Sequence, residues 1–369
     1  MRRGHFELLQ PICPGCQARG VSSPLRLNIV EDEHEGDILA GILGCSGCGA
    51  EYPIVDGLPI IVPDVRRYVR DNLFYIMART DLTPAVESLL GDASGPGSGM
   101  DSIRQHVSSY VWDHWADHDP RETGPAAGGA SPGGVARAVT YGLEMMAHDI
   151  PDGPVLDIGC GAGRSAVEIA VRTGRHVLGI DISTPLARVS RRAAVNGKVD
   201  YARRRVGLVY DRRCFSLDIR HDLVDIWICD ALALPFTSGT FALAVSLNVL
   251  DCLADPALGL AEMGRILEAG SQVLLSVPFD WTGHVTPVER WIGGHSQRGP
   301  HAGSAEAILD LMLGEEPPSA GALRRQGPAR DVPWHVRIHE RSCMHYLARL
   351  IVAQRTANEM ADAGVRSAG

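Results

Sequence analysis

From about residue 135 onward, apolar residues are grouped in short, almost uninterrupted runs that alternate with longer segments of mixed polarity. The runs predict strands buried on both faces, and the segments between them carry apolar residues at the three- and four-residue spacing of amphipathic helices. Alternation of this kind predicts an α/β fold with a mainly parallel sheet. Strands are expected at 154–158, 176–180, 224–229, 241–247 and 272–277, and helices at 135–148, 163–173 and 256–267.

The two ends of the chain follow other patterns. Residues 334–340 and 343–354 are successive strand-like segments with a short connection, which predicts a terminal antiparallel pair. Residues 1–63 end in a strand-and-turn pattern with Asp56-Gly57 as the turn. Between the ends, helical segments are interrupted by Gly/Ser/Pro-rich linkers at 91–99 and 124–134. We therefore expect three parts: a β-rich domain at 1–63, a helical segment with linkers at 64–134, and the α/β domain at 135–369.

The composition indicates the compartment and the kinds of partner of this protein more than the reaction it performs. The 369 residues are 45% hydrophobic and 21% charged, and the formal net charge of −9 argues against a surface devoted to nucleic acid. The first residues lack the apolar core of a signal peptide, and the longest apolar run, 241–250, is about half of what a bilayer requires. We therefore expect a cytoplasmic protein that does not enter a membrane. The nine cysteines are then expected to be thiols or metal ligands rather than disulfides.

A glycine-rich loop follows the first strand of the α/β part, in Val155-Leu-Asp-Ile-Gly-Cys-Gly-Ala-Gly-Arg164. Gly159, Gly161 and Gly163 allow a sharp turn and a close approach of the backbone to a ligand, and the next helix starts at the loop. A dinucleotide fold would use G-x-G-x-x-G, whereas the spacing here is G-x-G-x-G with Asp157 ahead of it. A carboxylate at that point suits the ammonium group of S-adenosylmethionine (SAM) rather than a pyrophosphate.

Acidic residues also follow the next two strands. Asp181, with Ile182 after it, can accept both hydroxyls of a ribose, and Asp230-Ala231 can bind the amino group and a ring nitrogen of adenine. Asn248 ends a further strand, at the edge of the sheet where ligands of open α/β sheets bind.

In this order and spacing the motifs resemble the class I SAM-dependent methyltransferases. The resemblance covers about residues 135–355 and implies a Rossmann-like fold with a seven-stranded, mainly parallel sheet and a terminal antiparallel pair. It also implies SAM as the cofactor, with Arg164 beside the glycine loop. Tyr110, on an aromatic helical segment ahead of this part, would then cover the methionine end of SAM, or would only pack.

A narrower resemblance concerns the methyl acceptor. Residues 248–256, 277–294 and 338–342 are similar to the methyltransferase domain that ends ovothiol synthase, which implies methylation of an imidazole nitrogen. Trp281 and Trp291 would form walls for a flat ring, and Asp251 would contact it. Glu289 or His295 would take a proton. Each of these residues has an ordinary structural alternative.

Two CxxC pairs, Cys13/Cys16 and Cys45/Cys48, are separated by 28 residues. Tight turns at both pairs would bring four thiolates onto one structural zinc ion, with a hairpin through 25–30 and 38–43 between them. The block resembles the zinc-ribbon activator proteins of tRNA methyltransferases, including its Tyr52-Pro-Ile-Val-Asp-Gly-Leu-Pro59 ending.

Three functions remain open from the sequence. The first is a SAM-dependent methyltransferase acting on a nitrogen, or another heteroatom, of a small molecule or peptide. The second is an RNA or protein methyltransferase that uses the ribbon and an arginine-rich stretch, and the third is a non-catalytic scaffold that binds SAM and zinc. The sequence does not indicate the oligomeric state. The arginine-rich stretch would meet phosphate or an acidic substrate, or it would be a solvated insertion or one paired with the acidic run at 31–37. Its arginines are Arg188, Arg191, Arg192, Arg203, Arg204, Arg205, Arg212 and Arg213.

Overall fold

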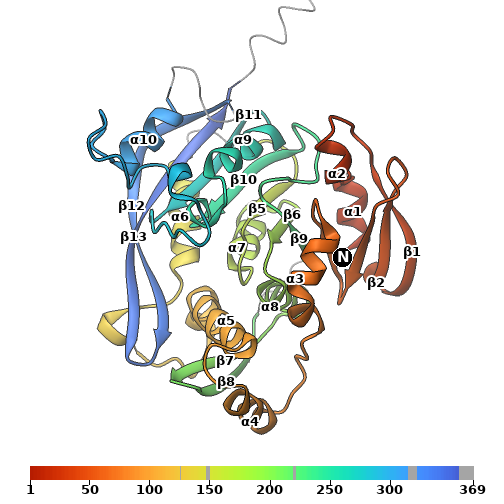
Figure 1. The fold of residues 1–369 in the computed structure, drawn as a ribbon, viewed down its shortest axis with the longest axis vertical. Coiled ribbons are helices and arrows are strands. Elements are labelled where there is room, and N and C mark those ends of the chain that lie inside the picture. The colour runs from red at the N-terminus through yellow and green to blue at the C-terminus, as the bar shows by residue number, and fades with distance from the viewer. Residues whose placement is uncertain (125, 147–149, 219–221, 315–321, 357–369) are drawn as a thin grey trace, which may run out of the picture.

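A seven-stranded sheet forms the centre of the molecule, in the order β9-β6-β5-β10-β11-β13-β12 (Figure 1). The computed structural model describes residues 1–124, 126–146, 150–218, 222–314 and 322–356. Strands β9 through β11 are parallel to one another, whereas β13 pairs antiparallel with both β11 and β12. The strands are β5 (Val155–Ile158), β6 (Val177–Asp181), β9 (Val224–Cys229), β10 (Phe241–Leu247), β11 (Leu267–Val277), β12 (Leu323–His339) and β13 (Ser342–Arg355).

Both faces of this sheet are covered, which explains the uninterrupted apolar runs. Every residue of β5 and β9 is buried. Side chains alternate between two cores, so that Val155 packs with residues of α6, α7 and α8 while Leu156 and Ile158 pack with residues of α9. Each predicted strand and helix is present, but two helices end earlier than predicted: Met146 after α6 is extended, and Leu267 begins β11. Residues 147 and 148 of the first predicted helix lie outside the described part. The helices are α6 (Gly134–Met145), α7 (Arg164–Thr173), α8 (Thr184–Asn196), α9 (Pro256–Ile266) and α10 (Ala305–Met312).

The prediction of a sheet limited to seven strands was wrong, because the N-terminal block extends it to eleven. Ile60 and Ile61 of β4 pair in parallel with Ile228 and Cys229 of β9. All four residues of β4 are buried, so this strand needs cover on both faces, and the edge of the central sheet provides it. The block comprises α1 (Arg3–Leu9), α2 (Pro14–Gln17), β1 (Leu25–His34), β2 (Asp37–Cys45), β3 (Glu51–Val55) and β4 (Leu58–Ile61).

Buried ion pairs reinforce this junction. The guanidinium of Arg191 on α8 contacts Asp37 of the N-terminal block, and it lies 3.2 Å from Asp225 of β9. Asp225 is fully buried and also accepts a hydrogen bond from the indole of Trp227 at 2.7 Å. Removing one partner of such a network would leave a buried charge without its partner, which would destabilise the junction.

The remaining elements gather beside the carboxyl ends of the parallel strands (Figure 1). The long segment between Asp181 and Asp230 contains α8 and a separate two-stranded hairpin. None of the described helices combines the length and the apolar character needed to cross a bilayer. These elements are α3 (Val65–Met77), α4 (Pro84–Ser94), α5 (Gly99–Trp115), β7 (Lys198–Val206) and β8 (Val209–Ser216).

Candidate functional site

The glycine-rich loop between β5 and α7 tolerates no side chain at its three glycines. Gly159, Gly161 and Gly163 have φ values of 66°, 54° and 87°, in the left-handed region. A Cβ atom at Gly159 would lie 2.4 Å from a methyl of Val249, and one at Gly163 would lie 2.2 Å from the hydroxyl of Ser190. The loop is therefore packed on its outer side, with its backbone at the carboxyl edge of the sheet, where α7 begins.

Carboxylates stand at this edge on three neighbouring strands. Asp157 on β5 is buried and accepts a hydrogen bond from the Ser165 hydroxyl at 2.5 Å. Asp181, at the end of β6, accepts backbone hydrogen bonds from Gly161 at 2.9 Å and Ser183 at 2.8 Å. Asp230 follows β9 and accepts one from the backbone of Leu232 at 2.9 Å. The acids thus hold the loops in shape while remaining at the edge where a ligand of this fold binds.

Burial sets the protonation of two of these acids. Burial raises the pKa of Asp157 to about 7, with the hydrogen bond from Ser165 opposing the rise and the charge of Asp181 adding to it. Burial also raises the pKa of Asp181 to about 6, against the opposing backbone hydrogen bonds. A bound cation beside Asp157 would favour its charged form.

Asp157→Asn is expected to stabilise the unliganded protein at pH 8 and to weaken SAM binding. Because the pKa of Asp157 is raised by folding, its contribution to stability is complete below its unfolded pKa and is lost as the pH rises through about 7. The amide escapes this loss, so urea denaturation should give a gain of about 1 kcal/mol or more at pH 8 and less at pH 5. Asp32→Asn, at an exposed position of β1, is the control. Equal stability of wild type and Asp157→Asn at pH 8 would contradict the assignment.

A second group of polar side chains lies beyond β10 and β11. Asn248, with a φ of 56°, accepts a hydrogen bond from the Ser276 hydroxyl at 2.7 Å, which fixes the end of β10 against β11. Asp251 is only 4% exposed, and its Oδ2 accepts the backbone N–H of Asp280 at 2.8 Å. The hydroxyl of Tyr346 on β13 in turn donates to Asp280 at 2.7 Å.

Within the described residues, Oδ1 of Asp251 has no hydrogen-bond partner. Burial and the nearby charge of Asp280 raise the pKa of Asp251. A buried carboxylate oxygen without a donor is costly, so a group that supplies a donor would bind there favourably.

Helix α5 connects the two groups. Its Tyr110 is 39% exposed, and burial together with the charges of Cys252, Asp181 and Asp251 raises its pKa. The indole of Trp115 donates to the carbonyl of Ala162 in the glycine loop at 2.7 Å. The helix therefore packs on the loop, and Tyr110 is close enough to Asp181 and Asp251 to feel their charges.

The side chain of Arg164, which was predicted to contact the cofactor, is held by other residues of the protein. Its side chain is nearly buried and pairs with Asp117 at 3.0 Å and Glu168 at 2.8 Å, and its backbone N–H donates to His114 at 3.2 Å. The side chain thus fastens α7 to the end of α5. Burial and the charge of Arg164 lower the pKa of His114 to about 3, so His114 is neutral and accepts that bond.

The candidate acceptor residues after β11 belong mainly to their own loop. The rings of Trp281 and Trp291 stack at 6.3 Å, and the Trp291 indole donates to the carbonyl of Thr286. His295 hydrogen-bonds to Ser296 and to the carbonyl of Trp291, and Glu289 lies exposed on a short helical turn. Their described hydrogen bonds do not reach Asn248 or Asp251.

Two other predicted site residues, Ile182 and Ala231, are accessible to solvent. Ile182 is 49% exposed beside Asp181, and Ala231 is half-buried.

Two residues of the acidic group, Asp280 and Tyr346, were not singled out from the sequence. They lie 66 positions apart in the chain. The position of Asp280 three residues after β11 was a usable signal, whereas Tyr346 lies on a strand whose register the sequence does not define.

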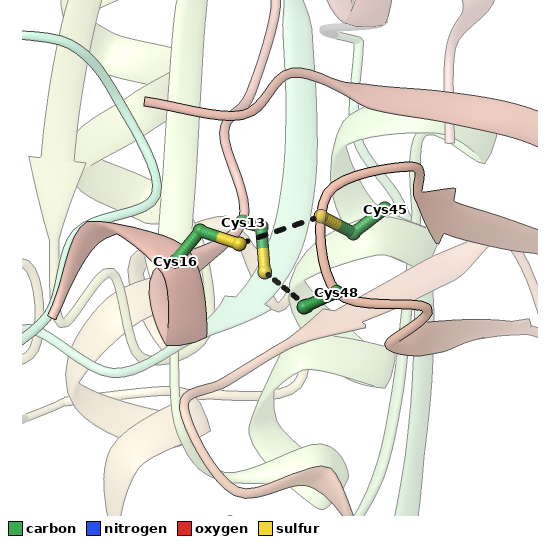
Figure 2. A group of neighbouring side chains, drawn as sticks. All are labelled: Cys13, Cys16, Cys45 and Cys48. Carbon is green, nitrogen blue, oxygen red and sulfur yellow. Dashed lines mark hydrogen bonds between the residues drawn. The ribbon is translucent and has the colours of Figure 1, made fainter. Parts of the chain in front are cut away.

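The four cysteines of the CxxC pairs converge, as Figure 2 shows. Their sulfur atoms all lie within 4.8 Å of one another, with Cys13 and Cys48 at 3.6 Å and Cys16 and Cys45 at 3.7 Å. A tetrahedral zinc site with Zn–S bonds of about 2.3 Å separates its sulfurs by about 3.8 Å. The residues therefore fit a four-cysteine metal site, of the closed kind that is structural.

Neighbouring groups lower the pKa of two of these four thiols, Cys45 and Cys48, whereas burial raises the pKa of Cys13 and Cys16. The Ser23 hydroxyl lies 3.2 Å from Cys45 Sγ, and the Tyr52 hydroxyl lies 3.1 Å from Cys13 Sγ. Burial opposes ionisation of Cys45, but the hydrogen bonds from Ser23 and from the backbone of Cys48 and Gly47 outweigh it and lower its pKa to about 6. Such outer contacts orient metal ligands.

The arginine-rich stretch is largely neutralised within the protein. Six of its eight arginines form ion pairs, among them Arg203 with Glu122, Arg213 with buried Asp119, and Arg191 with Asp37 of the acidic 31–37 run. Arg204 instead donates to the side chain of Gln105 and the carbonyl of Gly207. Few of these charges are available for phosphates.

Comparisons with known proteins match the central part of this site. Residues 156–275 match the family model described as a methyltransferase domain. The O-methyltransferase rstn1 of Aspergillus nomiae is 25% identical over 122 residues, which are 33% of this chain and 45% of that protein. The O-methyltransferase cnsE of Penicillium expansum is 24% identical over 177 residues, 48% of this chain and 54% of that protein. This chain thus spans about half the length of these curated relatives.

Among solved structures, a SAM-dependent methyltransferase of Methanosarcina mazei superposes with a TM-score of 0.38 at 21% identity. That match covers 58% of this chain and 97% of the other.

Proposed function

We propose that this chain, which carries a class I SAM-dependent methyltransferase domain, transfers a methyl group from SAM to a nitrogen, or another heteroatom, of a small molecule or peptide with an imidazole-like ring. The observation that carries the proposal is the buried Oδ1 of Asp251, which has no hydrogen-bond partner among the described residues and lies beyond the carboxyl end of β10, near Asn248. A methyltransferase needs its acceptor next to the bound cofactor, and this edge is where both would meet.

The cofactor side follows from the strand-end acids. Asp157 would hold the ammonium group of SAM, Asp181 the ribose hydroxyls, and Asp230 with the Ala231 amide the adenine ring. The backbone of Gly159, Gly161 and Gly163 would contact the methionine part. When bound, SAM supplies a methyl group on a positively charged sulfur, so the protein has to align the acceptor and exclude water.

The acidic group supports a nitrogen acceptor that carries a proton. Asp251 Oδ1 would accept that proton and orient the ring, while Asp280 is held in place by the Tyr346 hydroxyl. The raised pKa of Asp251 is closer to the pKa of a protonated imidazole than the pKa of an ordinary carboxyl group is. This suits Asp251 as a base. Tyr110 would close over the reacting atoms from α5.

The N-terminal block would contribute stability through a structural zinc ion on Cys13, Cys16, Cys45 and Cys48. Its last strand continues the sheet next to β9, and β9 ends at Asp230. The ion would therefore support the strand that positions an adenine ligand, with no part in the chemistry.

An acceptor screen with methyl-labelled SAM tests the proposal. The panel comprises histidine, thiol-bearing histidine derivatives, imidazole-containing peptides, other small heterocycles with N–H or O–H groups, and bulk RNA. We expect label in an imidazole-type compound and none in RNA, because most of the arginine stretch is paired internally. Label only in RNA would overturn the proposal in favour of a nucleic-acid methyltransferase, and SAM binding without transfer to any acceptor would favour a scaffold.

A further inference from the structure

A cavity of about 290 Å³ lies between α3, α4, α5, α8 and the β7–β8 hairpin. These elements gather around α5 in the lower part of Figure 1. None of the strand-end acids, and neither Asn248 nor Asp251, lines it. Its volume is close to the lower limit for sites that enclose small organic ligands.

The walls of this cavity are mainly apolar. They come from α3, the segment between α3 and α4, α5 and α8, so no single helix forms it. Moving an apolar ligand from water into an apolar cavity of this size is favourable, because the apolar surface of the ligand leaves its contact with water. The apolar lining side chains include Phe74, Leu82, Met100, Ile103, Val107 and Val189.

Five arginines and two carboxylates are the charged residues of the lining. Both carboxylates are already occupied, since Arg212 contacts Asp200 at 2.5 Å and Glu87 at 2.8 Å. Arg79 and Arg188 pair with Asp81 and Asp56, which do not line the cavity.

Arg192 of α8 is different. It donates to the Thr80 hydroxyl at 3.1 Å, and it has no ion pair with any carboxylate in the described part of the chain. The cavity therefore holds a half-buried cation whose charge is not balanced locally.

Arg104 also lines the cavity, but its charge is paired within the protein. It lies on α5, is 7% exposed, and its Nε forms an ion pair with Glu87 at 3.6 Å, although the described residues give this Nε no hydrogen bond. Its guanidinium lies 3.8 Å from the centre of the Tyr210 ring, and a Cβ atom at Gly91 would clash with it. Gly91 thus leaves room for this guanidinium, and Arg192 is the lining arginine that has no ion pair among the described residues.

We propose that this cavity is a binding site for a small apolar carboxylic acid. The apolar part lies among Phe74, Ile103 and Val107, and the carboxylate pairs with Arg192. Arginine suits this role because its planar fork matches a carboxylate. The site is separate from the proposed acceptor position, so its test does not depend on methyl transfer.

The test measures binding of 2-naphthoate, 4-phenylbutyrate and decanoate to the full chain by calorimetry, each beside its primary amide. At least one acid should bind with a Kd below about 1 mM, and its amide should bind at least about tenfold more weakly because the ion pair is lost. Arg192→Gln should weaken the acid to the level of the amide. Arg66→Gln, at an exposed position of α3 outside the cavity, should leave the affinity unchanged.

The position is checked by NMR of methyl-labelled methionines, with Met100 assigned from Met100→Leu. The acid should shift the Met100 methyl, which lines the cavity, and leave buried Met263 of α9 in place. The proposal is overturned if no acid binds, if acids and amides bind equally, if Arg192→Gln binds as wild type does, or if Met100 does not respond.

Discussion

Asp251→Asn is expected to slow methyl transfer by about a hundredfold and to leave SAM affinity within about twofold. A positioned general base contributes about a hundredfold or more to a rate, and asparagine keeps the shape of the side chain but cannot take a proton. The backbone N–H of Asp280 still finds an oxygen, so the local fold should persist. Single-turnover transfer from labelled SAM to the acceptor found in the screen measures the effect.

The pH profile separates a base from a merely structural acid. Burial raises the pKa of Asp251, and only its ionised form takes a proton, so the wild-type rate should rise with pH through that raised pKa. The Asn variant should lose this rise, and Asp218→Asn, at an exposed position, should keep it. A variant that is equally fast, or one with the wild-type pH profile, would remove Asp251 from the chemistry.

Cys45→Ser is expected to abolish zinc binding and to destabilise the protein by about 4 kcal/mol or more, the size typical of losing a metal site. Three thiols remain, but the serine hydroxyl is a poor ligand, and folding of small metal domains is coupled to the metal. Because β4 of this block pairs with β9, SAM affinity should fall as well. Elemental analysis, urea denaturation and calorimetry give the three quantities.

Cys214→Ser serves as the matched control, since Cys214 is an exposed cysteine of the β7–β8 hairpin. It should keep one zinc per chain and wild-type stability. A wild-type protein purified without any metal, and equally stable in chelator, would refute the structural zinc site.

Much of the central fold can be predicted from the sequence, because parallel strands buried on both faces leave apolar runs of recognisable length. The glycine loop is equally legible, since Gly159, Gly161 and Gly163 occupy backbone conformations that other residues avoid. Strand-end acids such as Asp181 and Asp230 are readable for a related reason. In a parallel sheet, the carboxyl ends of neighbouring strands meet at one edge.

Contacts between distant segments are not legible in this way. The residue types in Leu58–Ile61 do not indicate that β9 is their partner strand. Strands pair through backbone hydrogen bonds, which do not depend on residue type in this way. The same holds for the hydrogen bond between Tyr346 and Asp280, which depends on the register of β13 against β11. The arginine stretch can be predicted only in part: its charge and one acidic partner run, which supplies Asp37 for Arg191, are visible in the sequence, but other partners, such as Glu122 for Arg203, come from distant segments.

SAM is expected to bind at the carboxyl edge of β5, β6 and β9, and calorimetry of SAM with the full chain measures this binding. We predict one SAM per chain, and an affinity at least about tenfold lower for Asp181→Ala, because hydrogen bonds to a charged group contribute about 1.5–3 kcal/mol. Asp211→Ala, on β8 of the hairpin, should bind as wild type does. No binding of SAM by the wild type, or equal binding by Asp181→Ala, would contradict the account.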